Sequence, residues 1–143
     1  MTVPSFNDFT KEIVFNFKYK DELIGKEYSG EFVAKRPTIL NQLEIQKEAS
    51  LLRGEIKDLD SGIESFLYML AYIKIVVIQS PSWFFESNYV RDLYDAEIVP
   101  ELFNDIQERM AKQVIEVTKT TESNKETKIT EADKEPNIKQ QDG

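Results

Sequence analysis

The sequence has no cysteine and no histidine among its 143 residues. Without cysteine it can form no disulfide and has no thiolate for metal binding or nucleophilic catalysis. Without histidine it lacks the side chain best suited to proton transfer near neutral pH, which is also the commonest metal ligand. Glycine is scarce too, with five residues, and no phosphate-binding glycine loop, nucleophile elbow or metal motif occurs. We therefore expect no enzymatic activity and no cofactor.

Carboxylates are plentiful, but each group of them has an ordinary structural interpretation. Asp58 and Asp60 precede an expected helix, and a carboxylate there is stabilised by the positive end of the helix dipole. No oxygen-rich loop of the kind that binds calcium surrounds them. Asp92, Asp95 and Glu97 fit the solvated face of a helical segment better than a general acid–base set. We expect neither group to form a catalytic or metal site.

Basic residues are fewer than acidic ones, and no long apolar run occurs. The 18 basic and 26 acidic residues give a net charge of −8, and the only candidate basic patch is Lys35-Arg36. Because nucleic acid and anionic membranes repel an acidic protein, neither is expected as a partner. The longest apolar run, residues 66–78, contains Lys74 and is shorter than the roughly 20 residues of a membrane span. The first ten residues do not resemble a signal peptide, so a cytoplasmic location is expected.

Two segments near the N-terminus predict an antiparallel β-hairpin. Residues 11–20 alternate apolar and polar side chains, the period of a half-buried strand. Residues 28–35 form a second expected strand, and the polar segment 21–26 between them, with Gly25, is typical of a turn. A two-stranded hairpin is only marginally stable alone. We therefore expect this one to pack on the rest of the domain.

Helical periodicity accounts for most of the remaining domain. Thr38 is placed to cap a first helix that stops at Gly54. Its expected apolar stripe is Leu40, Leu43, Ile45, Ala49 and Leu52. Ser61 and Glu64 match a capping box that opens a second helix, which extends to about Gln79 and is apolar nearly all round. A helix of that kind lies in the middle of a fold.

Two further helices are expected before the composition changes. A short one lies within 88–98, and a longer one runs from Val99 to Lys119 with Pro100 in its first turn. Its periodic apolar positions are Leu102, Phe103, Ile106, Met110, Val114 and Val117. Residues 120–143 contain no aromatic and too few apolar side chains to offset the entropy of ordering, which predicts disorder.

These elements predict one α+β domain. Residues 1–10 form an N-terminal arm, and residues 11–119 form the domain, in which the N-terminal antiparallel β-hairpin packs on a small bundle of about four helices. Residues 120–143 form a disordered, acidic and polar tail.

Two short stretches are candidate protein-binding residues. The run Trp83-Phe84-Phe85 follows the helix-breaking Pro81. Its three rings can close the core beneath the central helix, or one or two can stay exposed as an anchor for a partner, since Trp and Phe are typical interface anchors. The pair Lys35-Arg36 forms an ordinary strand-to-helix junction or receives an acidic segment of a partner. Both alternatives are open at each stretch.

The order of these parts resembles the small tail assembly chaperones of long-tailed bacteriophages, which are encoded between the tail tube and tape measure proteins. The resemblance covers about residues 11–117. It rests on the hairpin, the two helices, Arg36-Pro37-Thr38-Ile39, Pro81-Ser82-Trp83-Phe84 and Leu93-Tyr94-Asp95. It implies a chaperone that binds the tape measure protein and keeps it soluble during tail tube assembly, with possible self-association along this client. An acidic surface with apolar patches suits such transient coating of an amphipathic helix.

Two other classes of protein fit the same size, charge and mixture of elements. One is a virion structural protein, either a head–tail connector or a tail completion protein, which would stay in the particle. The other is a bacterial protein-binding adaptor.

Overall fold

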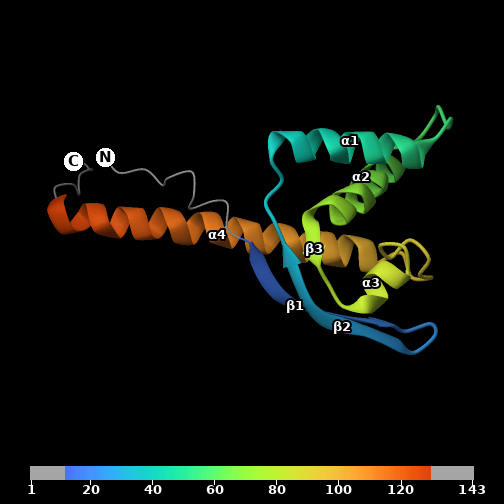
Figure 1. Cartoon of the computed structure of the whole chain (residues 1–143), viewed down its shortest axis with the longest axis horizontal. Coiled ribbons are helices and arrows are strands. Elements are labelled where there is room, and N and C mark those ends of the chain that lie inside the picture. The colour runs from blue at the N-terminus through green and yellow to red at the C-terminus, as the bar shows by residue number, and fades with distance from the viewer. Residues whose placement is uncertain (1–11, 130–143) are drawn as a thin grey trace, which may run out of the picture. The chain divides into compact units, whose positions relative to one another are not determined.

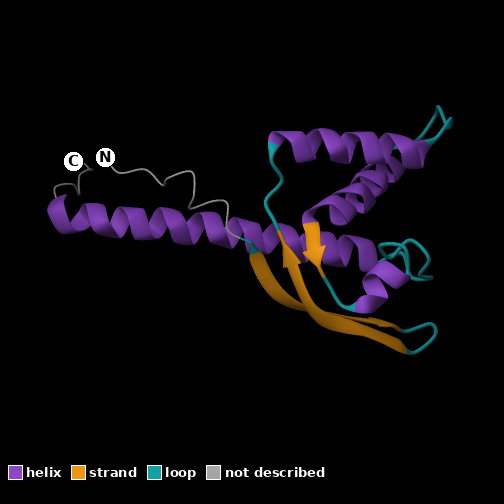
Figure 2. Cartoon of the chain, viewed as in Figure 1, coloured by secondary structure: helices purple, strands orange, loops and turns teal. Residues whose placement is uncertain are grey.

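A computed structural model describes the backbone of residues 12–129 and the side chains of residues 12–115 (Figure 1). The elements are β1 (Ile13–Asp21), β2 (Lys26–Ala34), α1 (Ile39–Arg53), α2 (Ser61–Val76), β3 (Val77–Gln79), α3 (Ser82–Glu86) and α4 (Ile98–Ile129). An antiparallel sheet that begins with an N-terminal hairpin, combined with helices, confirms the expected α+β class (Figure 2). The expected arm, residues 1–10, lies outside the described residues.

The chain divides into two compact units, and the sheet, the core and the surfaces described below belong to the unit of residues 10–110. The other unit includes the part of α4 from Ala111 onward. Helix α4 continues to Ile129, ten residues beyond the boundary expected at Lys119. Residues 130–143 of the expected tail lie outside the part of the chain that the structure describes.

The hairpin forms as the alternating pattern predicts. Strands β1 and β2 pair antiparallel from Ile13↔Ala34 to Asp21↔Lys26. In the turn, Gly25 has a φ of 68° and donates its backbone N–H to the Asp21 carbonyl at 2.8 Å. The left-handed region that this turn requires favours glycine.

A third strand, β3, was not expected. It pairs antiparallel with β2 through Val33↔Gln79 and Ala34↔Val77. The expectation that the central helix reaches Gln79 is therefore wrong, because α2 ends at Val76. The apolar run continues past the helix end, but its β-branched residues 77–78 suit a strand as well as a helix, and the edge of β2 offers them backbone partners.

Helix α1 begins and ends where expected, whereas the cap of α2 differs by one residue. Thr38 accepts a hydrogen bond from the Asn41 N–H at 3.1 Å, and Gly54 ends the helix with a φ of 63°. The N-cap of α2 is Asp60, whose carboxylate accepts from the Ile63 N–H at 2.9 Å. The predicted capping box at Ser61 is therefore wrong, and the expected role of Asp60 before a helix is confirmed.

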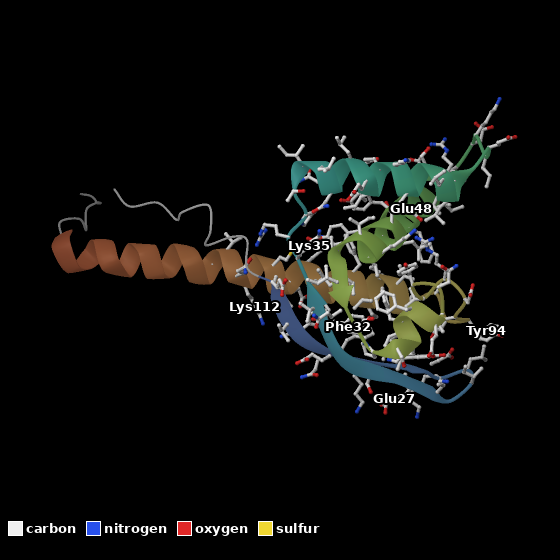
Figure 3. All side chains as sticks on the ribbon, in the orientation of Figure 1. Glu27, Phe32, Lys35, Glu48, Tyr94 and Lys112 are labelled. Carbon is white, nitrogen blue, oxygen red and sulfur yellow. The ribbon has the colours of Figure 1, made fainter. Side chains whose placement is uncertain are left out.

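The core lies between the sheet, α2 and α4. Leu70, Ala71, Tyr72, Ile73 and Val76 of α2 are buried, which confirms α2 as a core helix. Phe32 of β2, labelled in Figure 3, is fully buried among aromatic rings of β1 and α3. Helix α4 contributes Leu102, Ile106 and Met110, as its period predicts. Val114 is more than a third exposed, and the side chain of Val117 is not among those described.

The short helix expected within 88–98 is absent from the structure. Turns occupy this segment, and Asn88, Tyr89 and Val90 have consecutive φ values of 57°, 58° and 65°. Asparagine tolerates a left-handed backbone, but this conformation is unfavourable for tyrosine and especially for a β-branched valine. Hydrogen bonds hold it here: Tyr89 N–H donates to the Phe84 carbonyl at 2.9 Å, and Val90 N–H donates to Ser87 Oγ at 3.1 Å.

Candidate protein-binding surfaces

The three aromatic residues after Pro81 lie on the five-residue helix α3 and have different environments. Phe84 is fully buried and packs edge-to-face on Phe32, with their ring centroids 5.5 Å apart. Trp83 is partly buried, packs on Tyr28 and donates its indole N–H to the Ser29 carbonyl at 2.9 Å. Phe85 is 48% exposed. Phe84 and most of the Trp83 ring thus pack in the core. Phe85 is the ring of the three that is exposed to a partner.

The basic pair Lys35-Arg36 lies where β2 leads into α1, and Figure 3 labels Lys35 at this junction. The backbone N–H of Lys35 donates to the Val76 carbonyl at 3.0 Å. The Arg36 guanidinium donates through Nη2 to the Met110 carbonyl, also at 3.0 Å, and so ties the junction to α4. These contacts fit the role of a structural junction, and binding of an acidic segment here stays a prediction.

Helix α1 exposes a row of large apolar side chains that the sequence analysis assigned in part to the core. The exposed fractions are 80% for Ile39, 65% for Leu40, 62% for Leu43 and 67% for Leu51. We call these four residues the outward face of α1. Residues two apart on a helix point about 200° apart, so Leu43 lies nearly opposite the fully buried Ile45. The expected stripe is therefore wrong at Leu40 and Leu43.

A network of charged side chains holds the inward side of α1 against the rest of the domain. Glu48 pairs with Lys74 of α2 at 3.3 Å and with Arg91 at 3.0 Å. Both cations also lie over the ring of Tyr89, within 6 Å of its centroid. Burial favours the protonated acid, but the hydrogen bonds and charges of Arg91 and Lys74 outweigh it and lower the pKa of Glu48. One side of α1 is thus held against the domain by these contacts, and its outward face is exposed to solvent.

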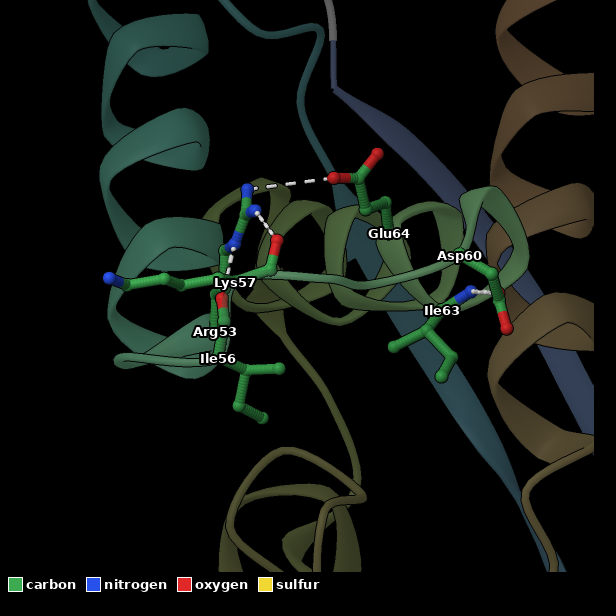
Figure 4. A network of polar contacts seen from close by, with 6 residues as sticks. All are labelled: Arg53, Ile56, Lys57, Asp60, Ile63 and Glu64. Atoms are coloured by element: carbon green, nitrogen blue, oxygen red, sulfur yellow. Dashed lines mark hydrogen bonds and ion pairs between the residues drawn. The ribbon is translucent and has the colours of Figure 1, made fainter.

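The connection from α1 to α2 is organised by Arg53 (Figure 4). Its guanidinium donates to the carbonyls of Ile56 and Lys57 at 3.0 and 3.1 Å and pairs with Glu64 at 3.5 Å. The side chain of Ile56 is 57% exposed. A cleft of about 290 Å³ opens between the two helices, lined by Gln46, Ala49, Ser50, Arg53, Leu59, Glu64, Leu67 and Tyr68. These contacts bind the end of α1 to the start of α2.

The acidic groups have mainly structural environments. Asp95 accepts a hydrogen bond from the Tyr19 hydroxyl at 2.5 Å and another from the Glu97 N–H at 3.1 Å. The expectation of a solvated face is therefore wrong for Asp95, which is only partly exposed, whereas Asp92 and Glu97 are exposed. Among the described residues, no group of three or more acidic, histidine or cysteine side chains is placed to hold a metal ion. No helix within residues 12–129 is long and apolar enough to cross a membrane.

Comparisons of the chain with protein-family models, with curated proteins and with solved structures gave no match. Among the surfaces of the described chain, the outward face of α1 gathers the most exposed apolar side chains on one element.

Proposed function

We propose that this protein binds an amphipathic helical segment of another protein on the outward face of α1 and keeps that segment soluble, without catalysing a reaction. The outward face carries this proposal: it exposes four large apolar side chains on a helix whose other side already lies in the core. Single exposed apolar residues are ordinary, but an apolar row along one element is typical of an interaction site.

The dimensions of the outward face suit a helical partner. It covers thirteen residues from Ile39 to Leu51, whose positions lie about 18 Å apart along the helix axis, or just over three turns. An amphipathic helix that packs along it would contribute apolar residues at spacings of three and four. The polar residues Glu44, Lys47 and Ser50 interrupt or border the row. Such a border favours a reversible contact over a permanent one.

The resemblance to phage tail assembly chaperones makes the tape measure protein the client that we propose, with the host cytoplasm as the place of action. A long helical client offers many similar apolar stretches, and several copies of the chaperone can bind side by side. Modest affinity per copy is then sufficient, because avidity supplies the strength. The outward face, which consists of aliphatic side chains, suits contacts of this sequence-tolerant kind.

The test is co-expression with the tape measure protein. We expect the wild-type protein to raise the soluble fraction of that client, and the double variant Leu40→Ser/Leu43→Ser to lose the effect. Both leucines are more than 60% exposed, so the variant should stay folded, which its thermal midpoint checks. The control is Leu23→Ser at the hairpin turn, which removes an even more exposed leucine elsewhere and should solubilise like wild type.

Other outcomes would show which part of the proposal is wrong: the binding face, the client or the class of protein. If Phe85→Ser abolishes the effect and Leu40→Ser/Leu43→Ser does not, the client binds at the aromatic residue of α3. If the folded wild-type protein never solubilises the tape measure protein, the proposed client is wrong. Detection of the protein in purified phage particles by mass spectrometry would favour the head–tail connector or tail completion alternative, because a chaperone of this kind is lost before the particle is complete.

A further inference from the structure

Strand β1 lies at an edge of the sheet and has an open side. The strand order is β1-β2-β3, so β1 pairs on one side with β2 over its nine residues. On its other side β1 pairs with no strand of the described chain. A strand edge of this length presents unpaired backbone N–H and C=O groups, which are a template for another strand.

Helix α4 lies beside this strand and forms the second wall of a groove. The Arg109 guanidinium of α4 lies over the Phe15 ring of β1, 5.5 Å from its centroid. Between the two elements is a cleft of about 350 Å³, lined by Asn16, Phe17, Lys18, Glu101, Asn104, Asp105 and Glu108. We call this cleft the β1–α4 groove. A groove between a strand edge and a helix is a geometry in which an extended peptide can add to a sheet.

The α4 wall of the groove is negatively charged. Asp105 pairs with Arg109 at 3.2 Å, and Lys18 on the strand side pairs with Glu27 of β2 at 3.4 Å. Glu101 and Glu108 are exposed and form no ion pair with the described residues. They lie seven residues apart, about 10 Å along the helix. Among the residues that line the groove, the charges without an ion-pair partner are therefore the two carboxylates on one side of α4.

We propose that the β1–α4 groove binds an extended, basic segment of a partner protein, which adds to β1 as a strand. Side chains alternate between the two faces of a strand, so every second residue of the segment would face α4. Lysine or arginine at those positions would lie opposite Glu101 and Glu108. A second copy of this chain is the less favourable occupant, because it would bring another acidic α4 toward the first, and each chain has a net charge of −8. This inference does not depend on the function proposed for α1.

The experiment measures the binding of short labelled peptides to the full chain by fluorescence anisotropy. An eight-residue peptide of alternating lysine and threonine should bind, and alternating glutamate and threonine should not. The variant Glu101→Lys/Glu108→Lys should weaken binding about tenfold, since two exposed charge pairs change from attraction to repulsion. The matched control Glu55→Lys/Asp58→Lys makes the same change in net charge on the α1–α2 connection and should retain most of the affinity.

Backbone methylation distinguishes strand addition from simple charge attraction. A peptide methylated on alternate nitrogens loses the donors of one edge only. One of the two methylation frames should therefore abolish binding and the other should preserve it, and NMR shift changes should fall on residues 14–18 and 101–108. Equal affinity in both frames, equal weakening by the two charge variants, or no binding of the lysine peptide would each overturn the proposal.

Discussion

The indole nitrogen of Trp83 donates a hydrogen bond to the carbonyl oxygen of Ser29, 54 positions earlier in the chain, at 2.9 Å. The bond joins α3 to β2, and the indole ring packs on Tyr28 beside it. Trp83 is therefore part of the fold even though it is only partly buried. The three adjacent aromatic residues should therefore differ in how much free energy of unfolding is lost when each is replaced.

Trp83→Phe should keep most of the ring packing, lose the hydrogen bond and reduce the free energy of unfolding by about 1 kcal/mol. Phe84→Ala should cost about 3–5 kcal/mol because this ring is fully buried. Phe85→Ser should cost much less, since about half of its side chain is exposed. Denaturant unfolding of the three variants measures the order of these losses. Equal losses at Phe84 and Phe85 would contradict it.

The cap of α2 can be tested at two neighbouring positions. Asp60→Ala removes the carboxylate that accepts from the Ile63 N–H and should lower the free energy of unfolding by about 0.5–2 kcal/mol. Ser61→Ala, one residue later, should change it by less than about 0.5 kcal/mol. Chemical denaturation of both variants decides whether the cap lies at Asp60. A larger loss at Ser61 would restore the capping box predicted from the sequence.

Helix α2 offers a comparison between a buried and a partly buried position. Leu70→Ala should cost about 2–5 kcal/mol, because its side chain is buried against the core. Ile75→Ala should cost less, since Ile75 is only partly buried. Urea or guanidinium unfolding curves give both values. Losses below about 0.5 kcal/mol at both positions would place this helix on the surface.

Tyr72 predicts how stability falls at high pH. Burial, with the nearby Tyr68 as a lesser cause, raises the pKa of Tyr72 to about 12, and its hydroxyl donates to the Met110 sulfur at 3.5 Å. An unfolded tyrosine has a pKa near about 10. Because the folded pKa is the higher one, this stabilisation is complete below pH ~10 and declines as the pH rises toward 12, by up to about 2–3 kcal/mol. Thermal midpoints between these pH values should fall less steeply in Tyr72→Phe than in wild type. An identical slope would mean that Tyr72 ionises as readily in the folded state.

Removal of residues 120–143 should leave the thermal midpoint of the domain nearly unchanged. The last α4 side chain in the described core is Met110, and those of residues 111–115 are exposed or only partly buried. No described core contact depends on the deleted part of the chain. Calorimetry of the truncated protein checks this expectation. A fall of more than a few degrees would show that the deleted residues contribute to the domain.

Local sequence signals predicted the elements whose patterns have a single interpretation. The alternation in β1, the Thr38 cap and the Gly54 stop each reflect short-range sterics or hydrogen bonding, and all three appear in the structure. Strand β3 could not be separated from the end of the central helix, because residues 77–78 are apolar and β-branched in either case. Its identity depends on the edge of β2, which is a tertiary contact.

Only part of the candidate site could be predicted from the sequence. Periodicity shows that a helix is apolar, but it does not show which side the rest of the protein covers. The periodicity therefore predicts Leu40 and Leu43 in the core. In the structure the ion pairs of Glu48 lie on the opposite side of α1, and the two leucines are exposed. A useful signal was present: α1 has apolar residues on more sides than a single core-facing stripe requires. The turn at Asn88–Val90 gave no such signal, since non-glycine residues rarely adopt left-handed backbone conformations.

Gly30 has a consequence for how this sequence can diverge. Its φ is 147°, and a Cβ at this position would overlap the ring of Pro81, which lies before α3. The two positions are 51 residues apart, yet position 30 cannot gain a side chain while the proline ring at position 81 stays in place. In descendants of a common ancestor we expect glycine at the first wherever proline occupies the second, and replacement of the proline before or together with the glycine. Paired inheritance of these two residues would identify distant members of the lineage after most of the surface has diverged.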